Sequence, residues 1–173
     1  MLFRSDPFAE YPGVPPPSTL TPAQREAITA IQSLGPGEGA LLFGVTGSGK
    51  TLAYLEAVRR VLAAGRGAIV LVPEIGLTPQ TVSRLRGAFG DQVAVLHSAL
   101  SDGERADAWR MLRRGERRVA VGARSAIFAP VADLGMIVLD EEHEASYKNG
   151  ETDRKSTRLN SSHIQKSRMP SSA

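Results

Sequence analysis

The chain has 173 residues, which suits one globular domain with its own core, and its 42% hydrophobic and 23% charged residues argue against disordered, collagen-like and coiled-coil proteins. The absence of cysteine excludes disulfide bonds, thiolate zinc sites and cysteine nucleophiles, and it fits a protein of the cytoplasm, which we expect here. No apolar run approaches the roughly 18 residues that a membrane span needs. The net charge of +3 does not indicate nucleic-acid binding by the folded residues, because residues 154–173 carry five basic and no acidic residues whereas residues 1–153 carry 16 basic and 18 acidic ones.

The amino-terminal residues 1–19 are rich in proline and predict a flexible linker. A helix is predicted to begin next, because Thr21 is typical of an N-cap, Pro22 of a first helical position and Gln24 of the third position in a capping box. Apolar residues then recur at helical spacing until Gly-Pro-Gly at 35–37 ends the helix.

Beyond residue 40, short apolar runs alternate with helical patterns. The runs lie at 40–44, 68–73, 92–97, 118–123 and 135–140, and the helical patterns at 52–64, 78–89 and 101–114. Runs that are apolar on both faces and separated by helices are typical of a mostly parallel sheet with helices on both faces, so we predict an α/β fold. The last of these helices is expected to begin with a second capping box, Ser101 with Glu104, and to bury Ala108, Trp109 and Leu112.

The regular pattern ends after Lys148, and the remaining residues are rich in serine and have no periodicity. Their last 19 letters, KSTRLNSSHIQKSRMPSSA, resemble the translated adaptor sequence that ends many unrelated reading frames. We therefore expect residues 149–173 to be disordered and foreign to the natural protein. The alternative is a basic arm that binds nucleic acid.

The sequence GVTGSGKT at residues 44–51 matches the phosphate-binding pattern GxxxxGK[ST] and lies between an apolar run and a helical pattern. Its glycines let successive backbone N–H groups point inward, and the start of the next helix adds partial positive charge, so the loop can hold phosphate oxygens. Lys50 adds an ammonium for the β and γ phosphates, and Thr51 supplies a hydroxyl to Mg²⁺; a glycine-rich turn that matches by chance is the alternative. The predicted nucleotide-binding residues are Gly44, Thr46, Gly47, Ser48, Gly49, Lys50 and Thr51.

A cluster of carboxylates follows the last apolar run. Asp140 is predicted to hold Mg²⁺ together with Thr51, and Glu141 to deprotonate the attacking water; a solvated acidic turn is the alternative. His143 is less suited as a metal ligand because Mg²⁺ prefers oxygen, so we predict a coupling or packing role. If the acidic run lies beside the strand of the phosphate loop, Lys50 and Asp140 meet in one magnesium-triphosphate pocket.

These features indicate an ATP-hydrolysing P-loop protein without separating a DNA motor from a transporter ATPase or a small-molecule kinase. Four stretches narrow the class: GVTGSGKT at 44–51, LVPEIGLTPQ at 71–80, LHSALSDGERADAW at 96–109 and VGARSAIFAPVADLGMIVLDEEHEASYK at 121–148. Over residues 20–148 the chain resembles the PriA family of bacterial replication-restart helicases, the primosomal protein N′, which are DEEH-box members of helicase superfamily 2.

The resemblance implies that residues 20–148 form the first RecA-like motor lobe of an ATP-driven, 3′ to 5′ DNA helicase that uses ATP and Mg²⁺. It implies action in replication restart, with forked or single-stranded DNA and primosome proteins as partners. The family's second lobe, arginine finger and zinc-binding cysteine module have no counterpart in this sequence. Because a site of this type lies between two lobes and the chain would supply one of them, we expect the isolated chain to be nearly inactive. The alternative function is a P-loop switch module without helicase activity.

By the same resemblance, Gln24 reads the adenine of ATP, although its capping-box position explains the residue equally well. Ala123 stands where the family usually has threonine, which removes a hydroxyl contact. The resemblance also assigns DNA-facing or coupling positions after the strands, for which a helix cap, a turn or a short loop is the alternative. These positions are Pro73, Glu74, Thr78, Pro79, Gln80, Gly122, Arg124, Ser125, Glu142 and His143.

Four arginines recur at helical spacing near the end of the 101–114 pattern. They are Arg110, Arg113, Arg114 and Arg117. This spacing places them on one helix face, where they could follow a phosphate backbone. A solvated face opposite the core explains the spacing as well, and we favour that interpretation over a nucleic-acid contact.

Overall fold

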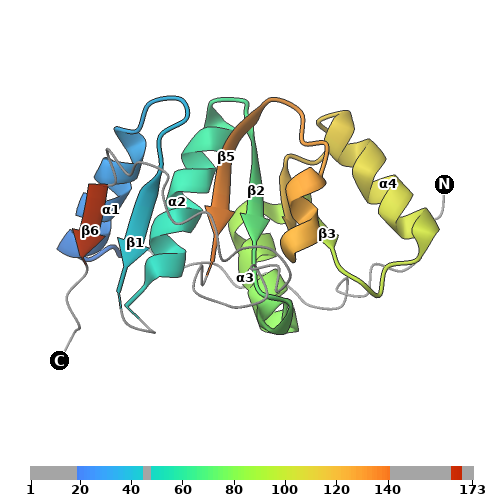
Figure 1. Cartoon of the computed structure of the whole chain (residues 1–173), viewed down its shortest axis with the longest axis horizontal. Coiled ribbons are helices and arrows are strands. Elements are labelled where there is room, and N and C mark those ends of the chain that lie inside the picture. The colour runs from blue at the N-terminus through green and yellow to red at the C-terminus, as the bar shows by residue number, and fades with distance from the viewer. Residues whose placement is uncertain (1–18, 45–47, 141–164, 169–173) are drawn as a thin grey trace, which may run out of the picture. The chain divides into compact units, whose positions relative to one another are not determined.

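Strands and helices alternate along the chain in the computed structural model, which describes residues 19–44, 48–140 and 165–168 (Figure 1). The described residues divide into two parts, each described here by itself. We name them the N-terminal part, residues 19–57 with 165–168, and the central part, residues 58–140.

The N-terminal part begins with α1 (Pro22–Gln32), continues through β1 (Ala40–Phe43) and includes the first turns of α2 (Lys50–Ala63). Helix α1 starts where the sequence predicted. The Thr21 N–H donates to Gln24 Oε1 at 2.9 Å and the Gln24 N–H donates to Thr21 Oγ1 at 3.2 Å, so both hydrogen bonds of a capping box are present. A small core holds this part together, formed by Ala27, Ile28 and Ala53 with Leu20, Ala23 and Leu42 against them.

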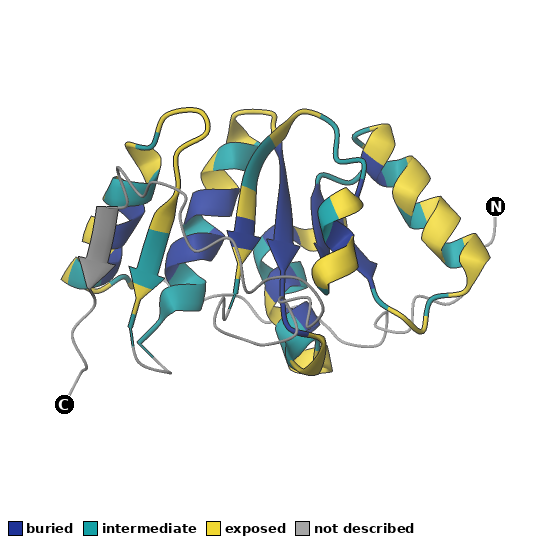
Figure 2. Ribbon diagram, in the orientation of Figure 1, coloured by how far each residue is buried: buried dark blue, intermediate teal, exposed yellow. Residues whose placement is uncertain are grey.

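Four parallel strands form the sheet of the central part, in the order β3-β4-β2-β5. Their bounds are β2 Gly67–Leu71, β3 Val93–Leu96, β4 Val119–Gly122 and β5 Leu134–Leu139. Every residue of β2, β3 and β4 is buried, as the dark blue strands of Figure 2 show. Because alternate residues of a strand point to opposite faces, this burial shows that the sheet is covered on both faces along β2, β3 and β4.

Two helices accompany this sheet after α2: α3 (Pro79–Phe89) and α4 (Asp102–Arg113). Short 3₁₀ turns complete the connections: η1 (Glu74–Gly76), η2 (Gly90–Gln92) and η3 (Arg124–Phe128). The second predicted capping box is confirmed, since the Ser101 N–H donates to Glu104 Oε2 at 2.9 Å and the Glu104 N–H donates to Ser101 Oγ. No described helix has the length and apolar composition that crossing a membrane requires.

The buried face of α4 is narrower than the sequence predicted. Leu112 is fully buried against Ile69 and Leu96, and Ala108 packs beside it. Trp109, however, is 39% exposed, so its predicted place in the core is wrong. Ala108 and Leu112 are four residues apart and lie on the same face of the helix, one turn from each other. Trp109 is rotated by about 100° from Ala108 and therefore lies at the margin of the apolar stripe.

β5 also differs from the prediction, since its side chains are not buried on both faces. It lies at the edge of the central sheet, and Leu134, Ile137 and Leu139 are 38%, 43% and 50% exposed. β5 pairs with β2, whereas β1 pairs with β6 (Gln165–Arg168) in a sheet of its own.

Four residues of the tail that was predicted to be disordered are described as strand β6. It pairs in parallel with β1, from Ala40 opposite Gln165 to Phe43 opposite Arg168. The backbone N–H and C=O groups along the edge of β1 offer hydrogen bonds to any extended segment, whatever its side chains. The sequence QKSR therefore carries no strand signal of its own. The other predicted tail residues, and the linker at 1–18, lie outside the described residues.

Candidate nucleotide and nucleic-acid site

The phosphate loop joins β1 to α2, as predicted. Gly44 follows β1, and Lys50 is the first residue of α2. The Lys50 ammonium donates a hydrogen bond to the Gly44 carbonyl, so the two ends of the loop are joined by a side chain. Gly49 has a φ of +82°, a left-handed conformation that glycine adopts without steric cost. Thr46 and Gly47 lie outside the described residues.

The loop's chemistry fits a phosphate ligand. Among the residues that the structure describes, Ser48 Oγ is buried and has no hydrogen-bond partner, so it can donate to a phosphate oxygen. Thr51 is half-buried in the first turn of α2, where backbone N–H groups have no helical acceptors. A hydroxyl here is an oxygen ligand of the kind that Mg²⁺ accepts beside phosphate oxygens.

Gln24 forms the predicted capping box of α1 and makes one additional contact. Its Oε1 completes the capping box, and its Nε2 donates to the Ser48 carbonyl at 3.4 Å. The side chain is 7% exposed, which is unusual for a glutamine. The bond to Ser48 spans 24 positions in the sequence, so no local pattern could have indicated it.

In the central part, three predicted DNA-facing residues lie together at the carboxyl ends of neighbouring strands. Glu74 follows β2, and Arg124 and Ser125 follow β4. With Ala123 they line a hollow of about 210 Å³. Glu74, Arg124 and Ser125 are exposed, so the hollow presents a carboxylate, a guanidinium and a hydroxyl to solvent.

Asp140 lies at the same edge of this sheet. It directly follows β5, and its backbone N–H donates to the Leu71 carbonyl at 2.8 Å, which fixes it beside the end of β2. In turn, the Val72 N–H donates to the Gly122 carbonyl at 3.0 Å. Hydrogen bonds therefore continue past the ends of these strands. The meeting of Asp140 with Lys50, which belongs to the other part, stays a prediction, and Glu141, Glu142 and His143 lie outside the described residues.

Thr78 has the structural role that was its alternative interpretation. Its hydroxyl accepts the Thr81 N–H at 3.2 Å and caps α3, and Pro79 occupies the first turn of that helix. Gln80 is exposed one position later, while Pro73 is buried before η1. Of this segment, Glu74 and Gln80 present polar side chains to solvent.

The arginines in and after α4 have different partners and do not form one uniform row along the helix. Arg110 pairs with Asp107 at 2.8 Å on the exposed helix face, and Arg114 lies 3.6 Å from Glu116. Arg117 instead donates through Nη1 to the Val93 carbonyl at 2.7 Å. This hydrogen bond holds the residues before β4 against the start of β3, so Arg117 has a structural role.

Replacing Arg117 by alanine is therefore expected to lower the free energy of unfolding by about 1–2 kcal/mol, because a part-buried charge-assisted hydrogen bond is lost. Arg113→Ala is the matched control: this exposed arginine is expected to change stability by less than about 0.5 kcal/mol. Urea denaturation of the three chains measures both values. Equal losses in the two variants would contradict the role of Arg117.

Two exposed apolar side chains of the turns η1 and η3, which also contain Glu74, Arg124 and Ser125, were not among the predicted site residues. Ile75 is 80% exposed and Phe128 is 75% exposed, in η1 and η3 respectively. Ile75 lies within the segment from Pro73 to Gln80 that the family pattern assigns to DNA, and Phe128 lies three residues after Ser125. The signal that could have found Ile75 is an apolar residue next to a predicted DNA-facing position.

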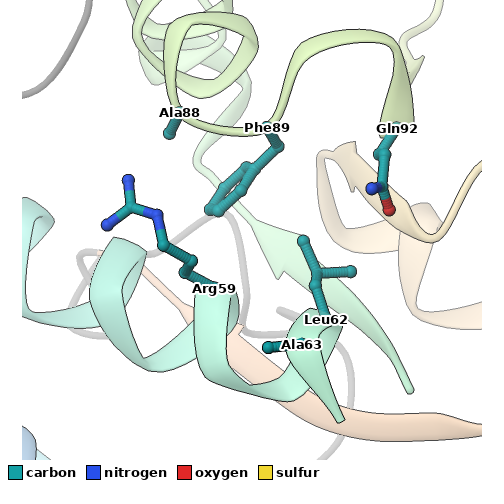
Figure 3. Close-up of a pocket in the computed structure, with 6 residues that line it drawn as sticks. All are labelled: Arg59, Leu62, Ala63, Ala88, Phe89 and Gln92. Carbon is teal, nitrogen blue, oxygen red and sulfur yellow. The ribbon is translucent and has the colours of Figure 1, made fainter. Parts of the chain in front are cut away.

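A second hollow, of about 320 Å³, lies where α2 and α3 end (Figure 3). Its lining residues are Arg59, Leu62, Ala63, Ala88, Phe89 and Gln92. Because α2 leads into the start of β2 and α3 into the start of β3, this hollow is at the amino ends of the strands. Ligands of α/β sheets bind at the carboxyl ends, so the second hollow is not the candidate site.

Comparison with known proteins finds replication restart proteins among the relatives of this chain. The chain is 58% identical over 141 residues to the replication restart protein PriA of Bacillus subtilis (strain 168), covering 80% of this chain and 18% of that protein. It is 51% identical over 129 residues to PriA of Synechocystis, covering 75% of this chain and 16% of that protein. The chain thus spans less than a fifth of these relatives, and the predicted resemblance to PriA is confirmed.

A solved structure shares the fold. RecG bound to a three-way DNA junction superposes with a TM-score of 0.63 at 31% identity, covering 73% of this chain and 18% of that one. This similarity confirms the predicted RecA-like α/β lobe. The family model of the DEAD/DEAH box helicase matches residues 21–173, which is most of the sequence. The chain therefore belongs to the DEAD/DEAH box helicase family.

Proposed function

We propose that this chain is the nucleotide-binding motor lobe of an ATP-driven, 3′ to 5′ DNA helicase that acts in replication restart. The observation that carries the proposal is the phosphate loop, where Lys50 joins the loop's ends and the buried Ser48 hydroxyl has no partner among the described residues. The PriA relatives support the pathway, and the helicase family supports ATP and Mg²⁺ as the nucleotide and metal.

The residues predicted to contact the phosphates, the metal and the attacking water have defined tasks in this proposal. The Lys50 ammonium and the loop's N–H groups bind the β and γ phosphates, and the Ser48 hydroxyl donates to a phosphate oxygen. Thr51 and Asp140 hold Mg²⁺, which neutralises charge on the phosphates when bound. Glu141 orients the attacking water and accepts its proton.

Nucleic acid is proposed to bind along the hollow formed by Glu74, Arg124 and Ser125. The Arg124 guanidinium suits a phosphate, and the Ser125 hydroxyl can donate to the same backbone. We propose that the arginine finger, the zinc module and the contacts with primosome proteins belong to the parts of the full-length protein that this chain does not span. Alone, the lobe is expected to bind Mg-ATP weakly and to hydrolyse it at a small fraction of the intact rate, since an arginine finger contributes about 10³–10⁵ in rate.

The binding half of the proposal is tested by Lys50→Ala in the 173-residue chain. Loss of the ammonium is expected to weaken the binding of a fluorescent ATP analogue by at least about tenfold, because a charge-assisted phosphate contact disappears. Fluorescence titration with Mg²⁺ present measures the dissociation constants. Arg113→Ala also removes one positive charge and is expected to leave affinity unchanged. Equal affinities of the wild-type chain and Lys50→Ala would contradict the proposed site.

A further inference from the structure

The turn η3 separates its side chains into an inward and an outward row. A 3₁₀ helix has three residues per turn, so residues three positions apart lie in line. Ala126 and the cap residue Ala129 form the inward row, at 2% and 8% exposure, and belong to the core of the central part. Ser125 and Phe128 are both exposed and form the outward row. The outer surface of η3 therefore carries a hydroxyl and a phenyl ring in line.

The backbone that carries this ring is held in place. The Ala126 N–H donates to the Ala123 carbonyl at 2.8 Å, and the Ala129 N–H donates to the Ala126 carbonyl at 3.0 Å. The turn also lies close against β4, since a Cβ atom on Gly122 would lie 2.8 Å from Ala126 Cβ. A ligand that meets Phe128 therefore needs little ordering of the backbone, which keeps the entropic cost of binding small.

The surroundings of Phe128 indicate what its ring can bind. Phe128 is 75% exposed, but single exposed apolar side chains are common, so exposure alone does not indicate a ligand. The informative observation is that Arg124 and Ser125 open the same turn and line the hollow where nucleic acid is proposed to bind. A guanidinium and a hydroxyl, followed one turn later by a flat apolar ring, match the phosphate and the base of a nucleotide.

The spacing along η3 suits one strand of nucleic acid. One turn of a 3₁₀ helix rises about 6 Å, so a phosphate bound at Ser125 leaves its own base or the adjoining base within reach of Phe128. Aromatic side chains bind bases by stacking, and every base has a π face on which this contact works. Bases enclosed in a duplex are already stacked on one another, so an aromatic ring favours unpaired bases.

We propose that Phe128 is a stacking platform for one base of a single strand whose phosphates contact Arg124 and Ser125. The inference rests on the proposed nucleic-acid site and deepens it, because it adds a contact with the bases to the contacts with the phosphates. Ile75 in η1 is exposed to a similar degree but has no π face, so the platform consists of Phe128.

Two ligands that differ only in their bases test this role. Oligothymidylate and an abasic deoxyribose-phosphate chain of equal length carry the same phosphate charges, and only the first can stack. Fluorescence anisotropy with the 173-residue chain measures both dissociation constants. We expect Phe128→Ala to weaken binding of oligothymidylate by about tenfold, the effect of one stacked base, and to leave binding of the abasic chain within about twofold of wild type.

Further variants separate stacking from apolar packing and from charge. Phe128→Tyr keeps the aromatic ring and is expected to bind oligothymidylate within about twofold of wild type. Phe128→Leu keeps an apolar side chain without a π face and is expected to lose about as much affinity as Phe128→Ala. Arg124→Ala removes a phosphate contact, so it is expected to weaken both ligands about equally and to reduce the salt dependence of binding.

Three results would overturn the inference. They are wild-type affinity of Phe128→Ala for oligothymidylate, an equal loss for the two ligands, and wild-type affinity of Phe128→Leu. The first of these is the result expected if another part of the full-length protein, rather than a base, covers Phe128. A wild-type chain that binds neither ligand would instead defeat the proposed nucleic-acid site, and the inference with it.

Discussion

Replacing Glu141 by glutamine in the full-length protein is expected to stop DNA-dependent ATP hydrolysis while leaving ATP binding intact. An amide has the size and hydrogen-bonding groups to orient water, but it cannot accept the proton at neutral pH. Loss of a general base costs about 10²–10⁴ in rate, so the turnover number should fall by that factor. A phosphate-release assay with and without single-stranded DNA measures the loss, and an ATP titration measures the affinity.

Glu116→Gln provides the matched control, since it makes the same chemical change at an exposed carboxylate that pairs with Arg114. We expect this variant to hydrolyse ATP at the wild-type rate. Wild-type turnover in Glu141→Gln would favour a P-loop switch, whose nucleotide state rather than hydrolysis controls a partner. Turnover that depends on a small-molecule acceptor and ignores DNA would favour a kinase.

Gly122→Ala is expected to lower the free energy of unfolding by about 3 kcal/mol, a cost at the upper end of that for overpacked cores. A Cβ atom here would lie 2.3 Å from the Leu96 carbonyl oxygen and 2.8 Å from Ala126 Cβ. Both neighbours are fixed, because Leu96 pairs with Gly122 across the sheet and Ala126 is buried. The strands must therefore separate to admit the methyl group.

Gly103→Ala makes the same change where a Cβ atom would meet nothing within 4 Å. Because Gly103 lies in α4, alanine there is expected to leave stability unchanged or raise it by up to about 1 kcal/mol. Urea denaturation of both variants and the wild-type chain measures the difference. If Gly122→Ala unfolded at the same urea concentration as Gly103→Ala, the close approach of β3 and β4 would be refuted.

Local chemistry made most of the elements predictable. Capping boxes begin α1 and α4 at the predicted residues, since their bonds join positions only three apart. Continuous apolar runs predicted β2, β3 and β4, because burial on both faces leaves no room for polar side chains. Placement of Trp109 failed because a position at the margin of an apolar stripe depends on the neighbour that the helix meets, which spacing does not contain.

Contacts between residues that are far apart in the chain could not be predicted from the sequence. Nothing in the letters around Gln24 indicates that its amide reaches Ser48, and nothing in QKSR indicates that these residues pair with β1. The phosphate-loop motif predicted Lys50 and Gly44 as candidate site residues, because the motif fixes their spacing. Glu74 and Arg124 were predicted from the family resemblance, and the structure places both at the carboxyl ends of parallel strands.

The two hydrogen bonds beyond the strand ends, from Asp140 to Leu71 and from Val72 to Gly122, have a mechanical consequence. The backbone of Asp140, which is proposed to hold the metal, and the backbone of Gly122 are linked through Leu71, the last residue of β2, and Val72, which follows it. Neither backbone can shift without breaking a hydrogen bond or moving the end of β2. We therefore expect a strain applied where nucleic acid is proposed to bind to reach Asp140, the proposed metal ligand, through this short path of backbone hydrogen bonds.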